Sequence, residues 1–122
     1  MQNNEVLSEL KRLNFEDFLY ILFAALAFIN IYGDQNDKKY LLTNDKSFQM
    51  KSNTIFEITL VVTFFIYLYF LQRNYKFYKK ASIENKDLFF IKLLGSSFLL
   101  AGAICLIYFQ FKQEDFIGSP AL

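Results

Sequence analysis

The stretch that decides the fold runs from Thr54 to Gln72 and reads TIFEITLVVTFFIYLYFLQ. After Glu57 it has fifteen residues without a charge, and the polar side chains inside it are Thr59, Thr63 and two tyrosines. At about 1.5 Å of rise per residue, a helix of this length covers close to the ~30 Å hydrocarbon core of a bilayer. The stretch therefore predicts a transmembrane helix.

Two further apolar stretches flank the central one. Residues 15–33 contain the uncharged run FLYILFAALAFINIYG, and residues 86–112 are apolar apart from one lysine and a few uncharged polar side chains. Three such stretches use about half of the 122 residues, which leaves too little chain for a separate soluble core. We expect residues 1–122 to form one all-α integral membrane domain with three transmembrane helices.

A short amphipathic helix is expected before the first span. Residues 1–13 carry charged side chains around one face, and Asn14 resembles an N-cap that begins a new helix. The apolar face consists of Val6, Leu7, Leu10 and Leu13. This segment is predicted to lie at the membrane surface, and the first span is predicted to end at Gly33 in a glycine cap.

The connection between the first two spans is predicted to be an outer loop. Residues 34–53 have mixed charge and turn-forming residues at both ends. Thr54 and Glu57 then match a capping box, in which both side chains cap the start of the second helix. The alternative is that Glu57 is a functional carboxylate for a cation or a proton, because ionisable groups in a membrane are costly.

The second span is predicted to continue as a helix to about residue 81. Basic residues recur there at helical spacing between tyrosines and a phenylalanine, which is typical of a segment at the lipid headgroups. The residues expected to contact the headgroups are Arg73, Lys76, Lys79 and Lys80. A tight turn with Asn85 as N-cap then pairs the second and third spans as a hairpin.

Small side chains gather on one half of the third span. They are Gly95, Ser97, Ala101, Gly102 and Cys105. In a membrane such a face lets helix backbones approach closely, so we expect it to pack against another helix. Residues 113–122 are predicted to form a tail outside the helix.

Orientation follows from the lysine and arginine residues near the spans. With the N-terminus inside, the inner side holds seven of them and the outer side five, which favours an N-in, C-out chain. Lysine outnumbers arginine eleven to two, which fits the AT-rich coding DNA of a low-GC bacterium. We therefore expect a multi-pass protein of a bacterial cytoplasmic membrane, in contact with anionic lipids.

Composition argues against several classes of function. The chain has no histidine and a single cysteine, so the commonest general base, the commonest metal ligand and an internal disulfide are all missing. A net charge of +1 argues against a nucleic-acid partner. We expect no catalytic residue, no metal site and no cofactor, and hence a protein that is not an enzyme.

Two functions remain. The first is a non-catalytic membrane component, either a homo-oligomer or an accessory subunit that packs against a partner membrane protein through the small residues of the third span. The alternative is an oligomeric channel or transporter for an ion or small molecule, because three helices cannot enclose a path alone. The polar residues that could line such a path are Asn30, Glu57, Lys92 and Gln110.

Overall fold

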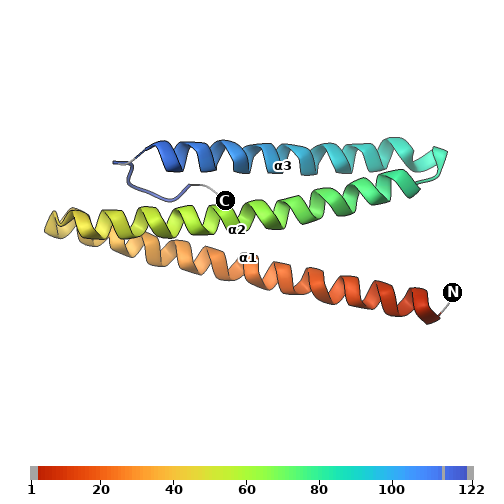
Figure 1. Cartoon of the computed structure of the whole chain (residues 1–122), viewed down its shortest axis with the longest axis horizontal. Helices are drawn as coiled ribbons and strands as arrows, with labels where there is room; N and C mark the ends of the chain where they lie inside the picture. The colour runs from red at the N-terminus through yellow and green to blue at the C-terminus, as the bar shows by residue number, and fades with distance from the viewer. Residues whose placement is uncertain (1–2, 114, 121–122) are drawn as a thin grey trace.

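The chain folds into three long helices joined by short turns (Figure 1). A computed structural model describes residues 3–113 and 115–120. Helix α1 spans Asn3–Thr43, α2 spans Lys46–Lys80 and α3 spans Lys86–Lys112, with a single 3-10 turn, η1, at Ile83–Asn85. All three long helices are long and apolar enough to cross a membrane, which suggests a multi-pass membrane protein.

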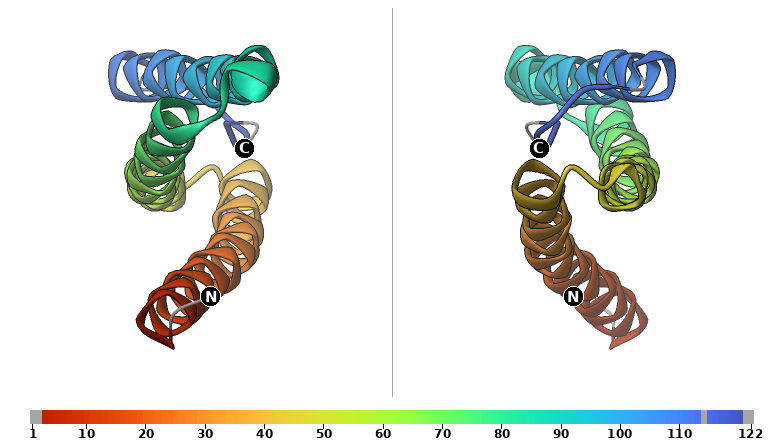
Figure 2. Two further views of the ribbon diagram at one scale, coloured as in Figure 1. Left: turned by 90° about the vertical axis from the view of Figure 1, so that its right-hand side faces the viewer. Right: turned by 90° about the vertical axis from the view of Figure 1, so that its left-hand side faces the viewer.

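Helix α2 lies between the other two helices. Both α1 and α3 pack on α2 and run antiparallel to it, and the view along the bundle shows an open arrangement rather than a closed triangle (Figures 1 and 2). The first turns of α1 diverge from α2, and residues 3–11 are exposed. The core therefore consists of two separate interfaces that share one helix.

The interface between α1 and α2, here called the α1–α2 seam, follows a spacing of three and four residues. Its residues are Glu16, Leu19, Phe23, Leu26, Asn30, Gly33 and Asp37 on α1, and Ser52, Phe56, Thr59, Ile66 and Arg73 on α2. A repeat of 3.5 residues keeps one stripe of each helix facing its partner along its whole length, as in a coiled coil.

Gly33 lies inside α1 and directly faces Phe56 of α2. A Cβ atom at this position would lie 2.5 Å from Cε1 of Phe56, whose side chain is 0% exposed. The predicted helix end at Gly33 is therefore wrong. The glycine leaves room for a phenylalanine ring instead of capping the helix.

The predicted outer loop over 34–53 is also wrong. No glycine or proline interrupts this stretch, and Asp37 and Ser52 continue the α1–α2 seam, so both helices run on and leave only Asn44 and Asp45 between them. Asn44 takes a left-handed φ of 60°, which asparagine tolerates well. Asp45 is the N-cap of α2, and its Oδ1 accepts a hydrogen bond from the Ser47 amide at 3.0 Å.

Two predicted helix starts do not exist. Thr54 lies inside α2, where its hydroxyl donates to the Met50 carbonyl at 3.1 Å, so the capping box with Glu57 is wrong. Asn14 lies inside α1, which runs unbroken from Asn3, so the described part of the expected amphipathic segment, residues 3–13, is not a separate helix; residues 1–2 lie outside the described residues. Arg12 and Glu16 hydrogen bond one turn apart across the expected junction and support a continuous helix there.

The continuous helices are longer than a bilayer requires. With 41 and 35 residues, α1 and α2 measure about 60 Å and 50 Å, against about 30 Å for a hydrocarbon core. An α1–α2 hairpin of this length extends beyond the apolar layer of a membrane.

Helix α3 occupies the residues expected for the third helix, 86–112, and pairs with α2 as a hairpin. Asn85 stands at the N-cap position, although its side chain makes no capping hydrogen bond. The buried residues of α3 recur once per heptad and are Ser96, Ala103 and Gln110. Together with Asn74 of α2, they form the interface here called the α2–α3 seam.

The tail folds back between α1 and α3. Its Gly118 amide donates to Asp37 Oδ2 of α1 at 2.9 Å, and Phe116 packs edge-on against Phe109 of α3. Pro120 is buried. The tail therefore lies between the two outer helices at the end where α3 finishes (Figure 2).

Candidate functional site

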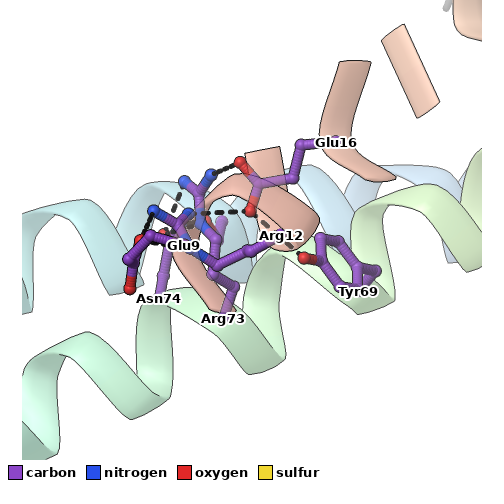
Figure 3. Close-up of polar contacts among 7 residues, drawn as sticks. Glu9, Arg12, Glu16, Tyr69, Arg73 and Asn74 are labelled. Carbon is purple, nitrogen blue, oxygen red and sulfur yellow. Dashed lines mark hydrogen bonds and ion pairs between the residues drawn. The ribbon is translucent and has the colours of Figure 1, made fainter. Parts of the chain in front are cut away.

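A polar cluster joins all three helices near the N-terminal end of α1. At its centre, the Glu16 carboxylate is 4% exposed and accepts hydrogen bonds from Arg12 at 3.0 Å, Arg73 at 2.9 Å and Tyr69 at 3.1 Å (Figure 3). Arg12 lies one turn earlier on α1, while Tyr69 and Arg73 come from α2. Two guanidinium groups thus neutralise one buried carboxylate.

The cluster continues from α2 to α3. Arg73 also donates to Oδ1 of Asn74 at 2.9 Å, and the Asn74 amide donates to the Ser96 hydroxyl of α3. On the exposed side, Arg12 donates a further hydrogen bond to Oε2 of Glu9 at 3.0 Å. One chain of hydrogen bonds therefore connects α1, α2 and α3.

Two further polar pairs lie along the α1–α2 seam. The Thr59 hydroxyl donates to Asn30 Oδ1 at 2.8 Å, and the Ser52 hydroxyl donates to Asp37. Thr59 and Ser52 are both 0% exposed. The polar groups of the seam thus satisfy one another between the helices, which removes the cost of burying them singly.

The spacing of these pairs fixes one antiparallel register. Seven residues separate Asn30 from Asp37 on α1 and Ser52 from Thr59 on α2, so one step along α1 matches one step back along α2. The Glu16–Arg73 pair fits the same register. Glu16 lies two heptads before Asn30 on α1, and Arg73 lies two heptads after Thr59 on α2. A slip of either helix would separate all three pairs at once.

The residues predicted to meet lipid headgroups separate into two groups. Lys76, Lys79 and Lys80 are exposed on the last turns of α2. Arg73 is 16% exposed and its guanidinium is engaged with Glu16 and Asn74. Headgroup contact by any of the four stays a prediction.

The small residues of α3 lie mostly on its exposed side. Gly95, Ala101, Gly102 and Cys105 are exposed and Ser97 is half-buried, whereas the buried residues of α3 face α2. A Cβ atom added at Gly95 or Gly102 would meet nothing within 4 Å. Gly102 also lines a cavity of about 200 Å³ with Leu60 and Thr63 of α2. Packing of the small-residue face against another helix stays a prediction.

The four candidate path residues do not line one channel within the chain. Asn30 is bonded to Thr59 in the α1–α2 seam, and the Lys92 side chain lies over the Phe77 ring near the start of α3. Glu57 and Gln110 do come together, because both line a cavity of about 440 Å³ between α2 and the end of α3.

Gln110 is an unusual buried group. Its side chain is 1% exposed, and neither its amide nitrogen nor its oxygen has a hydrogen-bond partner among residues 3–113 and 115–120. A buried amide without a partner costs stability, so its place in a polar cavity calls for an explanation. Over the same residues, no cluster of three or more histidine, cysteine, aspartate or glutamate side chains could hold a metal ion.

Sequence reasoning missed the central role of Glu16, Asp37 and Ser52. Glu16 lies two residues after the expected N-cap Asn14, and Asp37 and Ser52 belong to the stretch 34–53 predicted as a loop, so none of the three stands out as a contact between helices. The available signal was the spacing of three and four, which runs through these polar residues without a break.

Comparison of the chain with protein-family models, with curated proteins and with solved structures found no match.

Proposed function

We propose that this chain is a non-catalytic integral protein of a bacterial cytoplasmic membrane, N-terminus inside and C-terminus outside, that acts as a homo-oligomer or as an accessory subunit of a membrane complex. Anionic lipids and a second membrane helix are its partners in this proposal. The basic residues near the spans support the orientation, because the antiparallel helices bring the larger group to the end that holds the N-terminus.

The outward position of the small-residue face of α3 carries the proposal. Only 11% of the most apolar stretch of α3 is buried inside the chain, against 28% for α2. Lipid tails are as apolar as leucine, so helices associate in membranes through close packing at small residues. A Cβ atom built at Gly95 or Gly102 meets no atom within 4 Å, so a further helix has room to approach these two glycines.

The single cysteine provides a direct test. Cys105 is exposed on the same face as Gly102, one turn away. Oxidation of the wild-type protein in native membranes should give a disulfide-linked species through Cys105, and Gly102→Leu should lower its yield because the larger side chain separates the helices. Ala24→Leu, an equally apolar change at an exposed position of α1, is the control and should leave the yield unchanged.

The mass of the linked species distinguishes the two forms of the proposal. Twice the mass of the chain indicates a homo-oligomer, and a larger or unequal mass indicates a partner subunit. Equal yields from wild type and Gly102→Leu would contradict packing through this face.

A channel or transporter is the second candidate function, because Glu57 and Gln110 share one polar cavity. Capping no longer accounts for Glu57, so its carboxylate is free for a cation or a proton in this hypothesis. Wild type and Glu57→Gln should then differ in cation or proton flux in liposomes while keeping the same thermal stability. Glu84→Gln, at the exposed turn before α3, is the matched control. Absence of flux from the wild-type protein rejects this second function.

A further inference from the structure

Two separate cavities follow one another along α2 and α3 toward the turn that joins these helices, and the two together are here called the groove. Its α2 wall follows Tyr67, Phe70, Asn74 and Phe77, and its α3 wall follows Leu99, Ser96, Lys92 and Phe89. Each series is spaced by three or four residues, so each forms one stripe of its helix. The two cavities therefore lie one after the other along the same two stripes.

The deeper half of the groove is apolar. It has a volume of about 270 Å³ and lies between α1 and α3, with Tyr20 and Phe23 of α1 facing Leu99 of α3 across Tyr67 and Phe70 of α2. Because α1 and α3 both pack on α2 rather than on each other, no helix closes this space (Figure 2). Its mostly aromatic and aliphatic lining suits a hydrocarbon chain.

The other half of the groove is cationic. The Phe77 ring lies between cations from all three helices: Arg12 at 5.1 Å, Arg73 at 5.5 Å and Lys92 at 5.4 Å from its centroid. The two arginines are engaged with Glu16. Among the described residues, no carboxylate lies within salt-bridge distance of Lys92, which lines a cavity of about 410 Å³ together with Lys80.

We propose that this groove binds one anionic phospholipid of the leaflet at the N-terminal end, with an acyl chain between α1 and α3 and the phosphate on Lys92 and Lys80. Charge complementarity identifies the occupant, because a basic pocket between transmembrane helices at headgroup level matches an anionic lipid. The proposal depends on a bilayer location and not on the oligomeric state. It also accounts for a lysine in the apolar part of α3 near its start.

Lipid retention by the full-length protein tests the phosphate site. The protein in non-ionic detergent is titrated with phosphatidylglycerol, and bound lipid is counted by native mass spectrometry. Lys92→Gln should weaken binding about five-fold, the effect of removing one basic residue near an anionic lipid. Lys112→Gln is the matched control, because Lys112 also lies on α3 over an aromatic ring, Tyr108, but at the opposite end. If Lys92→Gln and Lys112→Gln weaken lipid binding equally, the phosphate does not bind at Lys92 and the proposal is wrong.

A second pair of variants tests the acyl groove. Leu99→Trp fills the apolar half of the groove and should reduce lipid retention, whereas Leu94→Trp, at an exposed position outside the groove-lining residues, should not. Soluble glycerol 3-phosphate should fail to displace the lipid. Displacement by this compound would show a site for free phosphate only, and equal retention in the two tryptophan variants would exclude the groove.

Discussion

The two interfaces of α2 differ in how their polar groups are used. In the α1–α2 seam, Glu16, Asn30 and Asp37 each meet a polar partner on α2. In the α2–α3 seam, the Asn74 and Ser96 side chains form one such pair, and Gln110 has no partner among the described residues. Both interfaces are antiparallel and of heptad spacing, so the difference lies in the polar contacts and not in the helix geometry.

This difference indicates what specifies helix pairing in an apolar solvent. Leucine and phenylalanine gain little by leaving lipid for another helix, so apolar side chains alone do not select a register. A polar group that faces lipid without a hydrogen-bond partner has a high free-energy cost, so paired polar side chains select one register. We infer that α1 and α2 are held in a single register by their pairs, whereas α3 depends more on the short turn at its start.

Removing the Glu16 carboxylate should have the largest effect. Glu16→Ala leaves Arg12 and Arg73 facing each other without their shared anion, and breaking a buried ion pair in this way should cost about 3 kcal/mol of stability. SDS-titration unfolding in mixed micelles measures the loss. Glu9→Ala is the control, because Glu9 pairs with Arg12 on the exposed side and should contribute less than about 1 kcal/mol. Equal losses would show that the cluster is not central to the α1–α2 seam.

A methyl group at Gly33 should have the next largest effect. Gly33→Ala directs a Cβ atom into the enclosed Phe56 ring, and such overpacking should cost about 2 kcal/mol in the same unfolding assay. Gly95→Ala adds the same methyl group to α3 where nothing lies within 4 Å, so it should be neutral or slightly stabilising. If the two alanine variants behaved alike, the close approach at Gly33 would be refuted.

The smallest predicted effects differ in sign between the two seams. Asn30→Leu removes a hydrogen bond to Thr59 and should cost about 0.6 kcal/mol, the average for polar contacts between membrane helices. Gln110→Leu removes a buried amide without a partner and should stabilise the protein by about 1 kcal/mol. Thermal unfolding of both variants beside wild type measures the contrast. A loss of stability in Gln110→Leu would mean that this amide has a partner in the folded protein.

The apolar spans were predictable from the sequence because hydrocarbon length sets how many apolar residues a crossing needs. The end of α3 was equally clear, since polar residues follow Lys112 at once. The α1–α2 turn was not, because Gly33 and the polar residues after it resemble the end of a helix and a loop. Their role depends on the facing helix: Gly33 is explained by Phe56, and Asp37 by Ser52.

The candidate sites were predictable only in part. Glu57 and Gln110 were singled out because polar groups in apolar stretches are costly, and they do share a cavity. Asn30 was singled out on the same ground, but its partner Thr59 was counted as an ordinary span residue. Glu16 was missed because its partner, Arg73, lies on another helix, and a single sequence does not show which helices meet.

The hydrogen bond between the Gly118 amide and the Asp37 carboxylate anchors the tail. It fastens the tail to the first helix, and the burial of Pro120 places the last described residue inside the fold instead of in solvent. An affinity tag fused to the C-terminus would therefore follow a segment that packs against α1 and α3. The first turns of α1 are exposed and make no such contact, so the N-terminus is the end on which to place a tag for purification or imaging.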